Sequence, residues 1–245
     1  MVTVKLREVT LRFDPGPLAL REISLELRSG ELVILAGANG AGKSALIRVS
    51  AALIEPSSGV VSYSFPGGKQ DAATLRKTVR VVSQHPSRQI LGATVREDLA
   101  ISADVAGVEE ALIPREADAH GLSALIDRPT HALSGGEQRR LALAGALMGD
   151  PRLLLFDEPF LELDYPSTRE FLRTVLDARE RGAGVVIATH DYHRVLAEAD
   201  RMIIMAHGRV EADDPPESVL PKAARLGLRP PEAPLSELTW LKGER

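Results

Sequence analysis

Cysteine is absent from this chain of 245 residues. Disulfides, zinc–thiolate sites, iron–sulfur clusters and a cysteine nucleophile are therefore excluded, so apolar packing must hold the interior together. Long apolar runs are also missing, because no stretch approaches the roughly 18 residues that a membrane-spanning helix needs. Residues 1–12 alternate apolar and charged side chains and lack the apolar core of a signal peptide. An intracellular chain with at most a peripheral membrane role fits these absences.

An excess of charge of one sign is missing as well. Lys and Arg total 30 and Asp and Glu total 34, which gives a formal net charge of −4. This imbalance is too mild for a polybasic nucleic-acid binder or an acidic tail, so no nucleic-acid partner is expected. Hydrophobic residues make up 44% and charged residues 26%, the proportions of an ordinary globular chain. The length suits one domain, or one domain with a subdomain.

Short apolar segments alternate with helical patterns along most of the chain. Residues 2–6 and 23–27 show the period of two that is typical of strands with one buried face, so the chain opens with β-structure. A continuous apolar run at 31–36 indicates a strand buried on both faces. Further strands are expected at 79–83, 152–157, 184–189 and 201–206. Strands that alternate with helices predict an α/β fold with a mostly parallel sheet.

Two parts of the chain depart from this alternation. Residues 85–149 contain no convincing strand and are expected to form helices with loops. We interpret them as a helical subdomain inserted into the α/β core. After residue 214 the pattern becomes short and rich in proline. We therefore expect one domain over residues 1–218 and a C-terminal appendage over residues 219–245.

A glycine-rich motif follows the doubly buried strand. It consists of Gly37, Ala38, Asn39, Gly40, Ala41, Gly42, Lys43 and Ser44, fits the Walker A pattern G-x-x-x-x-G-K-[ST], and continues through Ala45 into a helical pattern that reaches about Leu53. The glycines let backbone N–H groups surround a phosphate, and the helix N-terminus adds positive potential. Lys43 would neutralise phosphate oxygens and Ser44 would offer its hydroxyl to Mg²⁺. The segment predicts a nucleoside triphosphate site.

Two adjacent carboxylates, Asp157 and Glu158, end the apolar strand at 152–157. Beside a phosphate loop, Asp157 would hold Mg²⁺ and Glu158 would orient or deprotonate the water that attacks the γ-phosphoryl group. Taken alone, the two acids fit a merely polar strand end equally well.

A histidine, His190, follows the strand at 184–189. Because parallel sheets carry ligand sites at the carboxyl ends of their strands, His190 is expected to face the same crevice as the two acids. A lone histidine is more often a surface or packed residue, so this expectation depends on the neighbouring motifs.

The segment Leu133-Ser134-Gly135-Gly136-Glu137-Gln138 carries the most specific pattern. Locally it is a helix start, because Ser134 and Glu137 have the spacing of a capping box and the two glycines permit an anion to approach the helix. Placed between the phosphate loop and the paired acids, it resembles the signature motif of ATP-binding cassette (ABC) ATPases. The resemblance extends over about residues 2–215 and implies a P-loop NTPase core with an N-terminal antiparallel β subdomain and an inserted α-helical subdomain.

The resemblance implies a role for further residues of one nucleotide site. Gln84 would be the lid glutamine that touches Mg²⁺ and the attacking water, and His190 would be the switch histidine. Phe13 would stack on adenine, although a phenylalanine there could equally belong to the core. The implied catalytic set is Lys43, Gln84, Glu158 and His190, and the implied Mg²⁺ ligands are Ser44, Gln84 and Asp157.

Other matching residues are implied to act across a dimer. Ser134, Gly135, Gly136 and Gln138 would contact the γ-phosphate of ATP bound to the opposite subunit. Asp164 matches the D-loop aspartate that communicates between subunits, although small residues are commoner where Glu162 stands. Two cassettes would enclose two ATP molecules, so a second ATPase subunit, identical or different, is an expected partner.

Transport by such a protein needs a separate transmembrane coupling subunit, with or without a substrate-binding membrane component. The chain would then lie at the cytoplasmic face of the cell membrane. Residues 84–98 are similar to the lid region of energy-coupling-factor ATPases, which import vitamins or transition-metal ions, and residues 226–241 look like the tail of that group. In that group the lid region borders the groove for the coupling helices. Ser87 and Arg88 depart from the polar or acidic residues usual there.

Alternatives remain open at this point. The chain could serve another ABC importer or exporter, or could be a non-transport ABC ATPase acting on a macromolecular complex. A P-loop kinase would leave the segment 133–138 unexplained. A catalytically dead partner is disfavoured because Lys43, Gln84, Asp157, Glu158 and His190 are all present.

Overall fold

A central six-stranded sheet organises the protein. The computed structural model describes residues 1–65, 71–161, 163–235 and 238–241. The sheet has the strand order β5-β6-β7-β3-β8-β9. Its parallel strands are β3 (Leu32–Ala36), β5 (Val79–Val82), β6 (Leu153–Asp157), β7 (Gly184–Thr189) and β8 (Arg201–Ala206), and β9 (Arg209–Asp214) pairs antiparallel with β8. The predicted α/β fold with a mostly parallel sheet is confirmed.

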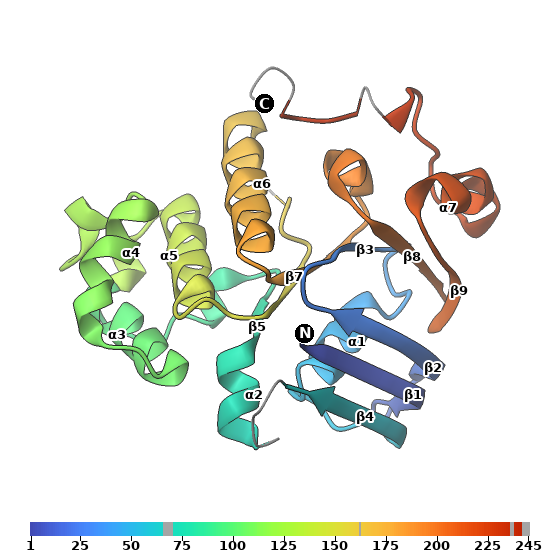
Figure 1. The fold of residues 1–245 in the computed structure, drawn as a ribbon, viewed down its shortest axis with the longest axis horizontal. Helices are drawn as coiled ribbons and strands as arrows, with labels where there is room; N and C mark the ends of the chain where they lie inside the picture. The colour runs from blue at the N-terminus through green and yellow to red at the C-terminus, as the bar shows by residue number, and fades with distance from the viewer. Residues whose placement is uncertain (66–70, 162, 236–237, 242–245) are drawn as a thin grey trace.

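A second, antiparallel sheet lies beside the first, at the lower right of Figure 1. It contains β1 (Thr3–Arg12), β2 (Leu18–Arg28) and β4 (Ser58–Ser64) in the order β2-β1-β4. The sequence indicated the first two strands but not β4 or β9. Both are edge strands with mostly exposed or half-exposed side chains, so they carry little of the apolar periodicity that reveals a strand.

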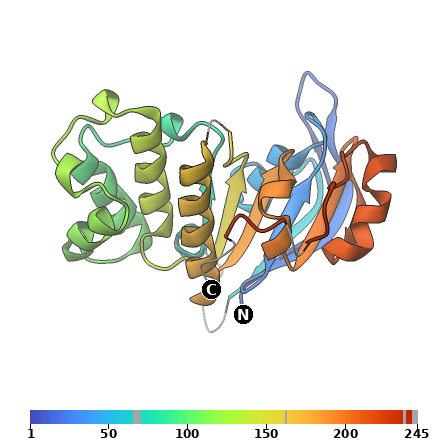
Figure 2. The same cartoon turned by 90° about the horizontal axis from the view of Figure 1, so that it is seen from above.

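Helices cover the central sheet on both faces. They are α1 (Lys43–Ser50), α2 (Ala72–Thr78), α6 (Tyr165–Glu180) and α7 (Pro216–Ala223). A separate group, α3 (Val95–Ala106), α4 (Ile113–Ala119) and α5 (Gly135–Leu147), lies to one side of the strands (Figures 1 and 2). Helix α1 ends before Leu53 because Ala52 has a φ of 53°.

Short 3-10 turns complete the chain. They are η1 (Pro86–Arg88), η2 (Glu110–Leu112), η3 (Ser123–Leu125), η4 (Thr130–Ala132), η5 (Tyr192–Arg194), η6 (Leu196–Glu198) and η7 (Ala224–Leu226). Turns η5 and η6 follow β7, so the chain after His190 is a compact loop and not a long helix.

Strand β3 explains why its sequence is continuously apolar. Leu32 and Ile34 pack in one cluster with residues of α5 and α6, whereas Val33 and Leu35 pack in a second cluster with residues of α1 and the antiparallel sheet. Each face of the strand therefore borders a different core, as expected for a sheet covered on both sides.

The helical group has a core of its own. Val95, Leu99 and Ala103 of α3 pack against Leu141 and Ala144 of α5 in a cluster separate from the other two. This separation supports the proposed division into a domain over residues 1–218 with an inserted subdomain at 85–149. The proposed appendage starts within α7 and packs on the main core through side chains such as Leu228 and Trp240, while its last four residues lie outside the described ranges.

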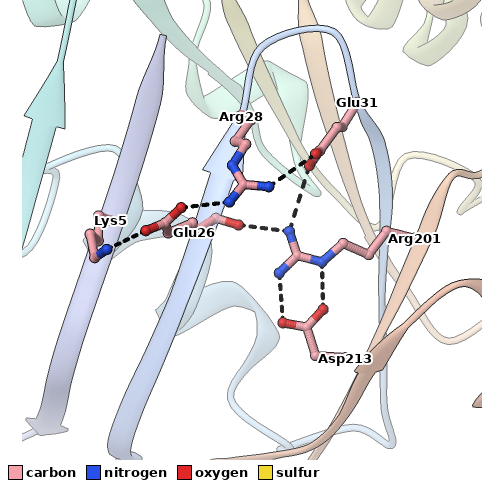
Figure 3. A network of polar contacts seen from close by, with 6 residues as sticks. All are labelled: Lys5, Glu26, Arg28, Glu31, Arg201 and Asp213. Carbon is pink, nitrogen blue, oxygen red and sulfur yellow. Dashed lines mark hydrogen bonds and ion pairs between the residues drawn. The ribbon is translucent and has the colours of Figure 1, made fainter. Parts of the chain in front are cut away.

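A network of charged side chains connects the two sheets, as Figure 3 shows. Arg201 of β8 binds both carboxylate oxygens of Asp213, at 2.5 and 2.6 Å, and donates to the backbone oxygen of Glu26 on β2. Glu31 lies between Arg201 and Arg28, at 3.6 and 3.5 Å. The hydrogen bonds that Arg201 donates to Asp213 raise the pKa of Arg201, so its charge is retained although the side chain is largely covered.

Candidate active site

The phosphate loop connects β3 to α1, and two of its glycines are required by the fold. Gly42 has a φ of 105°, in the left-handed region, and a Cβ there would lie 2.5 Å from the carbonyl oxygen of Ala19. At Gly37 a Cβ would lie 2.5 Å from the carbonyl oxygen of Met205. Only glycine lets the loop turn this tightly beside β2 and β8.

Lys43 folds back into this loop. Its Nζ donates to the carbonyl oxygen of Gly37 at 2.7 Å and to that of Ala38 at 3.3 Å, and lies 3.4 Å from Oε1 of Glu158. The side chain is only 6% exposed. A buried ammonium group therefore lies between the loop and a carboxylate. Its attraction for phosphate oxygens is weakened little by solvent there.

Ser44 and Asp157 form a second pair in the same place. The Ser44 hydroxyl donates to Oδ1 of Asp157 at 2.9 Å. Burial raises the pKa of Asp157, and the nearby charge of Glu158 adds to this, while the bond from Ser44 opposes it. A buried carboxylate with a raised pKa is one that a cation would stabilise.

The donor set around this pair fits Mg²⁺. Ser44, Asp157 and Gln84 offer oxygen atoms, and Mg²⁺ usually takes one or two protein carboxylates and completes its shell with phosphates and water. Within the described residues, no cluster of three or more His, Cys, Asp or Glu side chains forms a self-sufficient metal site. The set therefore suits an ion that arrives with a triphosphate.

Glu158 and His190 are joined across the ends of β6 and β7. Nδ1 of His190 lies 2.9 Å from Oε2 of Glu158, which also accepts from the His190 backbone N–H at 3.3 Å. Glu158 has a φ of 49°, a conformation that costs a non-glycine residue about 1–3 kcal/mol. Its N–H donates to the carbonyl oxygen of Ala188 at 2.8 Å, which helps to hold the strained backbone. The carboxylate is thus fixed in direction beside Lys43.

One cavity of about 660 Å³ brings most of the predicted residues together. Its walls include Phe13, Asn39, Gly40, Ala41, Gly42, Lys43, Ser44, Ala45, Gln84, Glu158 and His190. Phe13 is 44% exposed, which excludes the alternative that it is a core residue. Arg48 also lines this cavity, and the sequence reasoning missed it. The signal was available, since Arg48 lies one helical turn after Ser44 and so on the same face of α1.

The signature residues do not enter that cavity. Gly135, Gly136 and Gln138 line a different one of about 340 Å³ together with Asp164, and Gln84 borders both. Ser134 caps α5 through the predicted capping box, with its N–H donating to Glu137 at 2.6 Å and its hydroxyl accepting from the Glu137 N–H at 3.3 Å.

The two signature glycines serve no packing need among the described residues. A Cβ built at Gly135 or Gly136 would meet no atom of another described segment within 4 Å. This is the opposite of Gly37 and Gly42, where the chain itself demands glycine. Asp164 caps α6 by accepting from the Ser167 N–H at 3.0 Å, and hydrogen bonding to the side chain and backbone of Ser167 lowers the pKa of Asp164. Glu162 lies outside the described residues.

The fold and this site define a P-loop ATPase: a glycine loop between a parallel strand and a helix, with paired acids on a neighbouring strand. Comparison with known proteins narrows the class. Residues 20–161 match the family described as ABC transporter. The Cobalt import ATP-binding protein CbiO of Syntrophus aciditrophicus is 35% identical, with 97% of this chain and 87% of the relative covered.

A second relative and a solved structure indicate the same family. The Energy-coupling factor transporter ATP-binding protein EcfA1 of Thermotoga maritima is 34% identical over 85% of this chain and 80% of its own length. The solved structure of cbiO1 from Clostridium perfringens, described as part of the ABC transporter complex cbiONQ, superposes with a TM-score of 0.73 at 30% identity and covers 89% of this chain and 90% of its own. The chain belongs to the ABC transporter family, as an ATP-binding subunit that hydrolyses ATP. None of the helices in the described ranges has the length and hydrophobicity to cross a bilayer.

Proposed function

We propose that this chain is the ATPase of an energy-coupling-factor type importer for a vitamin or a transition-metal ion. The observation that carries the proposal is the likeness, over nearly the whole chain, to proteins described as cobalt import and energy-coupling-factor ATPases. The lid-region sequence at 84–98 supports the same subgroup. In this proposal the chain lies at the cytoplasmic face of the membrane, where its movement is passed to a transmembrane subunit.

We assign the chemical step to the residues that line the larger cavity. Phosphoryl transfer to water needs positioning and charge stabilisation more than covalent chemistry. Lys43 neutralises phosphate oxygens, and Glu158, held by His190, accepts a proton from the attacking water. Mg²⁺, held by Ser44, Gln84 and Asp157, would supply charge neutralisation on the phosphates.

The proposed working unit is a dimer that encloses two ATP molecules. The open space at Gly135 and Gly136 supports this, because glycines that the chain's own packing does not need leave room for a group from outside it. Their position at the N-terminus of α5 suits an anion such as a γ-phosphate. Each site would then combine the phosphate loop of one subunit with the signature segment of the other.

A groove between β5 and the helical group is the proposed place for the transmembrane subunit. It is lined by small residues of α5, including Ala142 and Gly145, and by Leu53, which is 62% exposed. Arg80 also lines it, and the Nε and Nη2 atoms of Arg80 are buried without a hydrogen-bond partner among the described residues. A buried guanidinium without a partner is costly, so an acceptor from the docking subunit would stabilise it.

Transport is tested by reconstituting the chain with the membrane subunits that co-purify with it. Proteoliposomes are assayed for ATP-dependent uptake of labelled cobalt and nickel ions and of a panel of vitamins. Uptake of one of these by the wild type, but not by Glu158→Gln in the same preparation, is the expected result. ATP-driven export, or co-purification with ribosomes in place of membrane proteins, would overturn the proposal.

The groove is tested by zero-length cross-linking. In Arg80→Lys, a carbodiimide joins the new amine to any carboxylate in direct contact, and mass spectrometry identifies the site. A link to an acidic residue of a membrane subunit is expected, with Arg76→Lys, at the groove margin, as the matched control. Links only within this chain would place the partner elsewhere.

A further inference from the structure

Arg194 occupies a junction that the proposed chemistry does not use. It lies in η5, four residues after His190, and its guanidinium is largely covered, with 22% of the side chain exposed. Five groups surround it, and they come from three segments far apart in the sequence. An arginine that makes so many directed contacts fixes the relative positions of the segments it touches.

The first segment is the loop that carries the switch histidine. Nε of Arg194 donates to Oδ2 of Asp191 at 2.5 Å, and Asp191 is the residue directly after His190. The Asp191 backbone N–H donates in turn to the Thr189 hydroxyl at 3.0 Å, at the end of β7. Arg194 therefore holds the backbone on which His190 stands.

The second segment is the D-loop and the start of α6. Nη1 of Arg194 donates to the carbonyl oxygen of Leu163 at 3.2 Å and to the Thr168 hydroxyl at 3.0 Å. That hydroxyl donates to the backbone oxygen of Asp164 at 2.8 Å. The same guanidinium thus bonds directly beside Asp164 and, through Thr168, to Asp164 itself.

The third segment is the C-terminal appendage. The Trp240 ring lies 5.1 Å from the Arg194 guanidinium carbon, and the Phe160 ring lies 5.9 Å from it. Trp240 also contacts the ring of Tyr165, the first residue of α6, with centroids 5.1 Å apart. The indole thus packs on the guanidinium and on the first residue of α6, so it can hold the guanidinium in place by a cation–π contact.

The appendage is anchored to the same loop at other points. The Tyr192 hydroxyl and Nε2 of His193 both contact the backbone oxygen of Arg229, the latter at 3.1 Å. The Thr239 hydroxyl donates to Oε1 of Glu198 at 2.6 Å. The tail therefore follows the loop after the switch histidine along its length and does not merely fill a gap in the core.

We propose that Arg194 is a positioning residue that fixes the switch-histidine loop relative to the D-loop, and that Trp240 of the C-terminal appendage holds it in place. The appendage then controls the rate of hydrolysis without touching the nucleotide. His190 acts at its own subunit's site, and Asp164 faces the other site in the proposed dimer, so the Arg194 junction connects the two. The role of His190 in hydrolysis and this connection between two sites rest on the proposed function.

The test separates binding from turnover in the assembled complex. Trp240→Ala and Arg194→Gln are expected to lower kcat about tenfold or more, because small misplacements of catalytic groups are costly, with KM for ATP changed less than about twofold. Trp240→Phe keeps a ring over the guanidinium and is expected to restore kcat. The double variant is expected to be no slower than the worse single one, since both act on one junction.

Arg229→Ala is the matched control. Among the described residues its side chain pairs with exposed Glu232 on the same appendage, so kcat and Tm should match the wild type. The proposal is overturned if Trp240→Ala keeps wild-type kcat, or if its kcat falls only in proportion to folded protein lost and Trp240→Phe does no better. Should Arg194→Gln fail to fold, the Trp240 pair decides alone. Failure of the transport proposal is distinct, because it concerns uptake by the wild type, not the ratio between these variants.

Discussion

The phosphate-loop cavity and the signature cavity meet at Gln84, yet they differ in what the chain supplies to each. In the first, Lys43, Ser44 and Glu158 each contact a partner from the same chain. In the second, Gly135 and Gly136 face open space. One half of the machinery is pre-organised within the subunit, whereas the other half presents a surface. In the proposed dimer, a single chain would therefore bind nucleotide but need the signature segment of the other subunit to hydrolyse it.

The largest expected effect comes from Glu158→Gln in the phosphate-loop half. Loss of the proton acceptor should lower steady-state hydrolysis about 10²–10⁴-fold in the assembled complex. ATP binding should persist, because Gln preserves the shape beside Lys43 and His190. Turnover is measured by phosphate release and binding by equilibrium dialysis. Wild-type turnover would remove Glu158 from the proposed role.

Gly136→Asp should disable the signature half without changing how the isolated subunit binds ATP. An acid there would repel the γ-phosphate held by the opposite subunit and lower hydrolysis about 10²-fold. It should not harm folding, because a carboxylate in the first turn of α5 interacts favourably with the helix dipole. ATP affinity of the isolated subunit should equal that of the wild type. Lys43→Ala is the contrasting variant, expected to lose that affinity. An equal loss of ATP affinity in Gly136→Asp and Lys43→Ala would contradict the division of the machinery into two separate halves.

Replacing a glycine by alanine should destabilise the protein in the phosphate-loop half but not in the signature half. Gly42→Ala places a Cβ 2.5 Å from a carbonyl oxygen at a φ of 105°, and should lower the free energy of unfolding by about 1–3 kcal/mol. The added methyl of Gly135→Ala meets no other described segment and should leave the free energy of unfolding within about 0.5 kcal/mol of the wild type. Urea unfolding without nucleotide measures both. A destabilised Gly135→Ala would mean that the signature segment packs on this chain.

The smallest expected effect is a pH dependence of the half that carries the signature. His120, which ends α4, is 8% exposed, and burial lowers its pKa, with a contribution from Arg181. A base with a depressed folded pKa contributes stability that is present above its unfolded pKa and lost as pH falls through the folded pKa. Between about pH 7 and 5 the wild type should therefore lose more Tm than His120→Gln does. Parallel losses in both would exclude His120 as the cause.

Short sequence patterns predict many elements of this structure. Strands such as β3 and β7 are apolar along their whole length, and the Walker A segment combines its glycines with a strand before and a helix after, so each is visible in a short window. Strands β4 and β9 are not visible in this way. An edge strand with exposed side chains is defined by its hydrogen bonds to the neighbouring strand more than by its own residues. Arg48 lies beyond the Walker A segment and its neighbour Ala45, so the motif alone does not reveal it.

The sequence by itself determined the family, the phosphate loop, the paired acids and the capping box at Ser134, because each depends on residues close together in the chain. Tertiary structure decided that His190 meets Glu158, that Phe13 is exposed at the cavity, and that the signature glycines lie in a separate cavity. It also placed Trp240 against Arg194 and Tyr165, between the loop after β7 and the start of α6. Such contacts join segments far apart in the sequence, and their geometry follows from how the sheet and helices pack.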